Sequence, residues 1–128
     1  MNGKSLLVVD DSATFRRLLC LSLTRIEGIS EQNITQADNG AEALSKLRAG
    51  SFDLVLTDIN MPEMSGLELV QAVRQDLDNK QLPIVIISTR GSEVEVEKGI
   101  ELGASGYLSK PISMSQLRDV VVGLLCPE

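Results

Sequence analysis

Short apolar segments alternate along this chain with longer segments of helical periodicity. The apolar segments are 6–9 (LLVV), 33–37, 52–57 (FDLVLT), 84–88 (IVIIS) and 105–109 (SGYLS). Continuous apolar runs of this length are typical of strands buried on both faces, and strands that alternate with helices are typical of a parallel sheet. The pattern therefore predicts an α/β fold, in which five parallel strands form one sheet and five helices cover both of its faces.

The expected helices are 12–26, 40–49, 66–77, 92–103 and 112–125. Ser12, Asn39 and Ser113 precede three of them and are suitable N-caps. In the first helix, Leu18 and Leu19 both have the spacing of a buried face. The segment 92–103 is ambiguous because its first half, SEVEVE, alternates like a strand. We expect a helix there, since parallel neighbouring strands need a crossover connection.

Length and composition exclude several classes of protein. The 128 residues predict one domain, 1–128, with a core of about residues 4–125, and the apolar runs are too short for a membrane span. A net charge of −6 and 2% aromatic residues disfavour direct binding of nucleic acid. The chain has no histidine, which excludes His-based metal sites and triads. Cys20 and Cys126 form no disulfide framework, so we expect free thiols and a cytoplasmic protein.

Polar side chains follow four of the five predicted strands. Asp10 and Asp11 follow the first strand, Asp58 the third, Ser88 ends the fourth, and Lys110 follows the fifth. The carboxyl ends of parallel strands meet at one edge of a sheet, where ligands of such folds bind. We therefore expect these side chains to converge on one crevice.

Three carboxylates in one crevice need a neutralising charge. Two like charges ~4 Å apart cost about 4 kcal/mol at an effective dielectric constant of ~20. An oxygen-only ligand set without His or Cys favours Mg²⁺, and Lys110 supplies a further positive charge. Carboxylate, hard cation, ammonium and hydroxyl together suit a phosphoryl group, and a carboxylate can itself form an aspartyl phosphate.

The motifs in this order resemble the receiver domain of two-component response regulators, of the CheY-like single-domain type. They are Asp10-Asp11 after LLVV, Asp58 after LVLT, the turn MPEMSG at 61–66, Ser88 after IVII, and Lys110-Pro111 after GYLS. Each motif is weak alone, but their order and spacing together are specific. The resemblance implies a flavodoxin-like sheet with strand order 2-1-3-4-5.

The resemblance also implies a phosphoacceptor and a metal site. Asp58 would take a phosphoryl group from a histidine kinase or a phosphotransfer protein. Asp11, Asp58 and the backbone carbonyl of Asn60 would bind Mg²⁺, and Asp10 would hold the ion indirectly. The chain would be a signalling switch that catalyses only its own phosphorylation and dephosphorylation.

Further residues acquire roles by the same resemblance. Lys110 would pair with the phosphate, Ser88 would bond a phosphoryl oxygen, and Pro111 would form a cis turn. Tyr107 matches the switch aromatic that responds when Ser88 is drawn toward the phosphate.

Three positions would tune dephosphorylation or the pocket, namely Asn60, Thr89 and Arg90. Thr89 stands where the family usually carries Ala or Gly, and Arg90 places a long cation beside the phosphate. We expect Arg90→Ala to change the lifetime of the acyl phosphate.

The expected output is protein binding through the fourth helix, fifth strand and fifth helix, by a monomer or weak dimer. One alternative is the receiver part of a longer regulator with a separate output domain. Another is an aspartate-nucleophile phosphatase, which is disfavoured because Asn60 stands where a second Asp is needed. The acidic segment 93–101 is either a solvated face or a surface for a basic partner. Arg16 and Arg17 are either solvated or contact a kinase.

Overall fold

The computed structural model describes residues 3–89 and 92–126 and shows one parallel sheet of five strands. The strands are β1 (Leu6–Val9), β2 (Ile34–Ala37), β3 (Leu54–Asp58), β4 (Ile84–Ser88) and β5 (Gly106–Ser109). Their order in the sheet is β2-β1-β3-β4-β5, which confirms the predicted α/β fold and strand order. The most polar strand, β2, lies at an edge, as expected.

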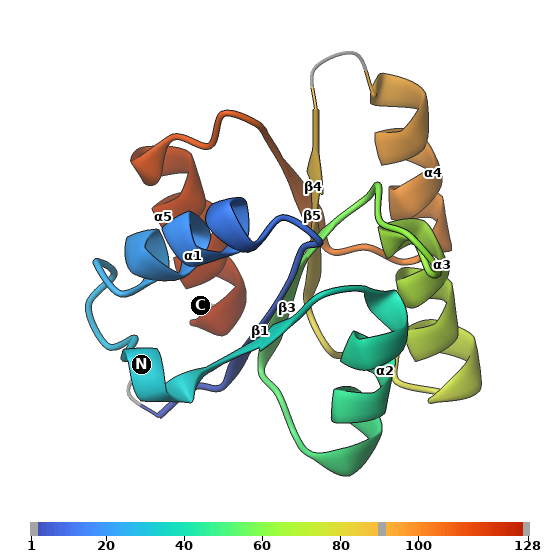
Figure 1. The fold of residues 1–128 in the computed structure, drawn as a ribbon, viewed down its shortest axis with the longest axis horizontal. Helices are drawn as coiled ribbons and strands as arrows, with labels where there is room; N and C mark the ends of the chain where they lie inside the picture. The colour runs from blue at the N-terminus through green and yellow to red at the C-terminus, as the bar shows by residue number, and fades with distance from the viewer. Residues whose placement is uncertain (1–2, 90–91, 127–128) are drawn as a thin grey trace.

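Helices cover both faces of the sheet (Figure 1). They are α1 (Ala13–Leu23), α2 (Gly40–Ala49), α3 (Gly66–Gln71), α4 (Glu93–Leu102) and α5 (Met114–Leu125). Helices α1 and α5 lie on one face, and α2, α3 and α4 lie on the other. Two apolar layers result, because Leu6 and Val8 of β1 face α1 and α5, whereas Leu7 and Val9 face the opposite layer.

The strand register brings the carboxyl ends of the central strands level. Val9 pairs with Thr57, Asp58 pairs with Ile87, and Ser88 pairs with Ser109. The residues that follow β1, β3 and β5 therefore emerge at the same edge of the sheet. This edge carries the candidate site.

The first helix is shorter than predicted, and one of its residues is misplaced. Helix α1 ends at Leu23 rather than at Ile26, although Ile26 is buried in the turn that follows. Leu18 is 57% exposed, so its predicted burial is wrong. Leu19 and Leu23, four residues apart, form the buried stripe, and Leu18 lies about 100° around the helix from Leu19.

Other boundaries shift by one or two residues. Strand β3 begins at Leu54 rather than at 52, and α5 begins at Met114 with Ser113 as its N-cap. Helix α3 ends at Gln71 and continues as a wider π-helical turn, η2 (Ala72–Asp76). A short 3₁₀ turn, η1 (Glu31–Asn33), precedes β2. These differences leave the topology unchanged.

The ambiguous segment is helical, as predicted, and glycine explains how it packs. A Cβ on Gly99 would lie 2.5 Å from Cδ1 of Ile86, so the missing side chain lets α4 approach the sheet closely. Gly103 ends the helix with φ +118°, a conformation that glycine adopts without strain. The buried Arg74 donates from Nε and Nη2 to the Gly103 carbonyl at 3.0 and 2.8 Å. Close packing and this clamp outweigh the strand-like alternation.

Across residues 3–89 and 92–126, no helix has the combination of length and apolar character that a bilayer span requires.

Candidate functional site

Three carboxylates from two neighbouring strands converge at the carboxyl edge of the sheet. Asp10 and Asp11 follow β1, and Asp58 is the last residue of β3. One oxygen from each carboxylate lies within 4.8 Å of the others. The pairing of β1 with β3 produces this approach, because both strands end at the same level.

Asp10 is held by the start of α1. Its side chain is buried, and Oδ1 accepts a hydrogen bond from the Ser12 N–H at 2.8 Å. Ser12 in turn caps α1 by accepting from the Phe15 N–H. The Arg16 side chain donates to the backbone carbonyl of Asp10. Asp10 Oδ2 is buried and accepts no hydrogen bond from the described residues, so it is available to a bound cation or water.

Asp58 occupies an unfavourable place for a negative charge. It is 6% exposed, and its Oδ1 accepts a hydrogen bond from the Ile59 N–H at 2.9 Å. Burial raises the pKa of Asp58 to about 6, and the charge of Asp10 acts in the same direction. Lys110 and the Ile59 N–H oppose the rise. The carboxylate therefore gains stability from any additional cation placed nearby.

Lys110 is the positive charge of the site. Its Nζ lies 3.5 Å from Asp10 Oδ2 and 3.8 Å from Asp58 Oδ2. The same atom lies 4.1 Å from the centre of the Phe15 ring, which is a cation–π distance. The Lys110 N–H donates to the Ser88 carbonyl at 2.8 Å, and the Lys110–Pro111 peptide bond is cis. Contacts with three elements thus direct the ammonium group toward the carboxylates.

The loop after Asp58 is anchored by a close backbone approach. The Gly66 N–H donates to the Ile59 carbonyl at 2.8 Å, and a Cβ on Gly66 would lie 2.1 Å from the Asp58 carbonyl oxygen. Ser65 and Glu68 form a capping box at the start of α3. Both ends of the loop 59–65 are therefore held close to the backbone of Asp58.

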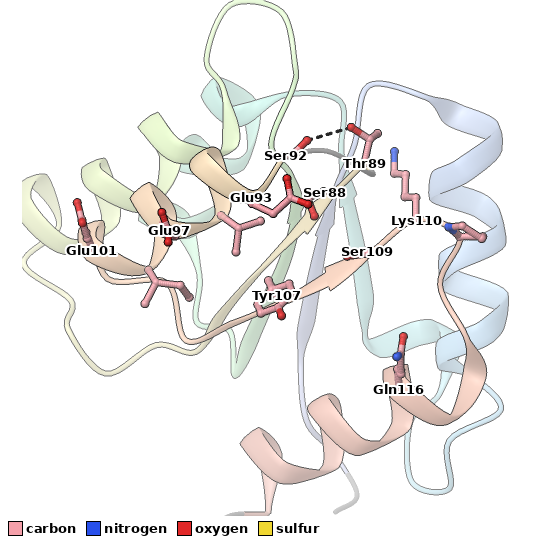
Figure 2. Close-up of a pocket in the computed structure, with 13 residues that line it drawn as sticks. Ser88, Thr89, Ser92, Glu93, Glu97, Glu101, Tyr107, Ser109, Lys110 and Gln116 are labelled. Atoms are coloured by element: carbon pink, nitrogen blue, oxygen red, sulfur yellow. Dashed lines mark hydrogen bonds between the residues drawn. The ribbon is translucent and has the colours of Figure 1, made fainter.

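The remaining predicted residues surround this cluster at different distances. Ser88 is buried at the end of β4, and the exposed Asn60 lies two residues after Asp58. Thr89 is exposed, and its Oγ1 lies 3.1 Å from the Ser92 Oγ. Tyr107 lies on β5 away from the carboxylates and is 53% exposed. Figure 2 shows Tyr107 and Ser88 lining a common groove. Arg90 lies outside the described residues.

Two residues of the site were not identified from the sequence. Phe15 has the periodicity of a core residue, and nothing in the sequence indicates its contact with Lys110. The sequence leaves Arg16 either solvated or in contact with a kinase. In the structure its guanidinium is not freely solvated, because it contacts Asp10, Asp38 and Gln36, with Nη1 2.9 Å from the Asp38 carboxylate. Phe15 and Arg16 both lie at the start of the helix that follows Asp10-Asp11. This position is the feature of the sequence that could have indicated them.

The ligand set fits a hard divalent cation. Within the part of the chain that the structure describes, the cluster offers carboxylate oxygens of Asp10, Asp11 and Asp58 as its ligands, and the exposed Asp11 leaves it open to solvent. Asp10 Oδ2 accepts no hydrogen bond from the described residues, and burial raises the pKa of Asp58, so both carboxylates would gain from further positive charge beside that of Lys110. A cation in this position would stabilise the cluster.

Comparisons with known proteins identify the family of this chain. The family model of the response regulator receiver domain matches residues 6–122. The chain is 42% identical to the chemotaxis protein CheY1 of Helicobacter pylori, over 92% of this chain and 96% of that protein. It is 35% identical to the chemotaxis protein CheY of Pseudomonas aeruginosa, over 91% of each.

A solved structure shows the same likeness. The chemotaxis response regulator CheY4 of Vibrio cholerae superposes with a TM-score of 0.83 at 34% identity, over 95% of this chain and 98% of that one. Sequence, fold and the acidic cluster thus point to one family. The chain belongs to the response regulator receiver domains, and it is a phosphoacceptor signalling module homologous to CheY.

Proposed function

We propose that Asp58 is the phosphoacceptor and that it receives its phosphoryl group from a phosphohistidine of a kinase or a phosphotransfer protein. An Asp58 carboxylate oxygen attacks phosphorus as the bond between phosphorus and the donor imidazole nitrogen breaks. The electron pair of that bond stays on the imidazole, and Asp58 becomes an acyl phosphate. Hydrolysis by water attack on phosphorus returns the Asp58 carboxylate and releases inorganic phosphate.

One observation supports this assignment above all others. Asp58 ends β3 within a cluster of three carboxylates, and Lys110 Nζ lies 3.8 Å from its Oδ2. Its pKa of about 6 leaves the side chain mostly ionised at pH 7, as a nucleophile must be. Lys110 would stabilise negative charge on the transferring phosphoryl oxygens.

Mg²⁺ fits this ligand set. We assign Asp11, Asp58 and the backbone carbonyl of Asn60 as its ligands, with Asp10 acting indirectly. When bound, Mg²⁺ would supply positive charge to the phosphoryl oxygens. Asp10 also keeps Lys110 near the reacting carboxylate, through the 3.5 Å contact of its Oδ2.

Phosphorylation would alter partner binding through the surface formed by α4, β5 and α5. Ser88 lies at the end of β4 beside the site, and Tyr107 lies one strand away on β5, where Ile86 pairs with it. We propose that Ser88 bonds a phosphoryl oxygen and that Tyr107 responds to its movement. Asn60, Thr89 and Arg90 remain predicted tuning positions.

The proposed module is a receiver domain spanning residues 1–128 that works in the cytoplasm as a monomer or weak dimer. It would catalyse only its own phosphorylation and dephosphorylation. A longer regulator that contains this receiver would use the same site.

The test is labelling with a small phosphoryl donor. The chain is incubated with Mg²⁺ and acetyl phosphate, and intact mass spectrometry is expected to show one added phosphoryl group, absent with EDTA. Asp58→Asn is expected to abolish the adduct, whereas Asp76→Asn, an exposed carboxylate remote from the sheet edge, should retain it. Labelling of the Asp58→Asn variant at the wild-type rate would refute the assignment.

A further inference from the structure

We propose that Arg16 is a positioning residue of the metal site, which orients the peptide unit between Asp10 and Asp11 so that both carboxylates lie where Mg²⁺ binds. This inference rests on the proposed function and adds a residue that is not itself a ligand of the ion. Arg16 lies at the start of α1, and its side chain is 13% exposed. Its contacts reach from the end of β1 to the end of β2.

The guanidinium of Arg16 contacts three acceptors. Nη1 donates to the Asp10 carbonyl and lies 2.9 Å from the Asp38 carboxylate, and Nε donates to the Gln36 side chain at 2.9 Å. Gln36 belongs to β2, and Asp38 directly follows that strand. Because the guanidinium is planar and its donors have fixed directions, these contacts together restrict the position of the Asp10 carbonyl.

The Asp10 carbonyl depends on this contact. The Asp10 N–H still belongs to the sheet and donates to the Ala37 carbonyl at 3.1 Å, but no backbone N–H of the described residues donates to the Asp10 carbonyl. This carbonyl and the Asp11 N–H belong to one planar peptide unit. The bond from Arg16 therefore fixes the plane from which the Asp11 residue extends.

Asp11 is the carboxylate of the cluster that most needs this support. The carboxylates of Asp10 and Asp58 each accept a hydrogen bond from a backbone N–H. Asp11 is exposed, and in the part of the chain that the structure describes it forms no ion pair. Its place in the cluster thus depends on the backbone that carries it, which Arg16 holds.

The charge of Arg16 would not by itself help a cation to bind. A positive charge near a Mg²⁺ site repels the ion, although the contact with Asp38 offsets part of that charge. Arg16 is also not among the charges that shift the pKa of Asp58. Replacing Arg16 by an uncharged residue therefore has opposite consequences in the two cases: a positioning role predicts weaker Mg²⁺ binding, and a charge effect predicts tighter binding.

The experiment titrates the metal-free full chain with Mg²⁺ and follows the amide resonance of Ile59, whose N–H donates to Asp58. Arg16→Gln removes both the charge and the planar group. Arg16→Lys keeps the charge but lacks the planar set of donors that bonds several acceptors at once. We expect each variant to raise the Kd for Mg²⁺ about tenfold, as for the loss of other groups that orient a metal ligand.

Arg17→Gln is the matched control. Arg17 is the exposed neighbour of Arg16 on the same helix, so its replacement removes the same charge. Because charges in solvent are screened, its Kd for Mg²⁺ should stay within about twofold of the wild-type value. If Arg16→Gln binds Mg²⁺ at least as tightly as the wild type does, or if Arg17→Gln loses as much affinity, the inference is wrong.

Two further measurements separate positioning from a general effect on stability. Urea denaturation in EDTA measures how far each substitution weakens the fold, and the Kd is measured where the variant is folded. A loss of stability without a change in Kd would overturn the inference. In the wild type, the Nε–H resonance of Arg16 should shift when Mg²⁺ is added, and that of Arg17 should not. If neither Arg16 variant folds, an unmoved Arg16 resonance overturns the inference.

Labelling by acetyl phosphate in the same samples distinguishes this inference from the proposed function. For Arg16→Lys, half-maximal labelling should need about tenfold more Mg²⁺ than for the wild type. Labelling of the wild type together with an unchanged Mg²⁺ affinity of both Arg16 variants overturns only the role of Arg16. Absence of labelling in the wild-type chain refutes the proposed function itself.

Discussion

Asp58 carries an electrostatic cost, because it is ionised in a place that water hardly reaches. Its pKa is about 6 in the folded chain and near 3.8 when fully exposed. The folded state therefore binds the proton more tightly than the unfolded state does. Protonated Asp58 therefore contributes to the free energy of unfolding. This contribution is complete below pH 3.8 and disappears as the pH rises through 6.

This linkage predicts that Asp58→Asn stabilises the metal-free protein. In EDTA at pH 7.5 the variant should have a free energy of unfolding about 2 kcal/mol above that of the wild type. Well below pH 3.8 the difference should vanish, since Asp58 is then protonated in both the folded and the unfolded state. Urea denaturation of both proteins across this pH range measures the free energies of unfolding. The two proteins share all other titratable groups, so the contributions of those groups cancel in the difference. A difference that is independent of pH would contradict the explanation.

Phe15 is predicted to be a positioning residue for Lys110. Its ring lies 4.1 Å from Nζ, on the side of α1, and helps to hold the ammonium near Asp10 and Asp58. Phe15→Leu should slow labelling by acetyl phosphate roughly threefold, because a cation–π contact of this kind contributes about 0.5–1 kcal/mol. Phe15→Tyr retains an aromatic face and should label at nearly the wild-type rate.

A purely structural role for Phe15 would give a different result. If the ring acts through Lys110, Phe15→Leu should leave the apparent affinity for Mg²⁺ unchanged, because the ring lies against the ammonium group of Lys110. If Phe15→Leu and Phe15→Tyr slow labelling equally, or if Mg²⁺ affinity falls in parallel, the ring does not act through Lys110. Labelling rates at several donor concentrations, with circular dichroism of each variant, make the comparison.

At the scale of elements, the junction between β3 and α3 determines where Asp58 lies. We predict that Gly66→Ala destabilises the protein by more than about 2 kcal/mol, because its Cβ would lie 2.1 Å from the Asp58 carbonyl oxygen. The backbone must move, and Asp58, the proposed phosphoacceptor, would move with it. Thermal and urea denaturation measure the stability, and the rate of acetyl phosphate labelling measures the displacement.

Gly123 provides the matched control. It lies within α5, and a Cβ there would meet no atom within 4 Å. Gly123→Ala should stabilise the chain by about 0.5–1 kcal/mol, since alanine favours helix. Equal effects of the two substitutions would show that helix propensity, rather than the approach of Gly66 to Asp58, controls the outcome.

Element type followed well from the sequence, whereas element ends did not. Strand β4 begins and ends where predicted because Pro83 precedes it and its four apolar residues are followed by Ser88. Helix α1 ends three residues earlier than predicted. Leu18 faces solvent because the sheet can cover only one stripe of that helix. Periodicity alone cannot say which of two adjacent leucines the sheet will cover.

At the scale of the whole molecule, a cation at one edge is expected to stabilise the entire fold. Mg²⁺ would bind the native cluster and not the unfolded chain, so saturating Mg²⁺ should raise Tm by several °C, as expected for about 2 kcal/mol of linkage. Differential scanning fluorimetry with Mg²⁺ and with EDTA measures the shift. Asp11→Asn should lose most of it.

The control for this prediction is a carboxylate outside the cluster. Asp76→Asn should keep the full Mg²⁺-dependent shift, because Asp76 lies on the turn η2. A shift of the same size in Asp11→Asn and in the wild type would show that Mg²⁺ acts on the overall charge of −6 rather than at this site.

The order of segments determined the fold class, and the polar residues after the strands indicated which edge would carry the site. Both follow from local physics, since apolar periodicity selects strand or helix and parallel strands end together. Only the tertiary structure decided how deeply Asp58 is buried, that Phe15 and Asp10 contact Lys110, and that Glu93, Glu97 and Glu101 border a groove. Burial, cation–π contact and charge facing a cavity depend on side chains distant in the sequence, and packing alone brings them together.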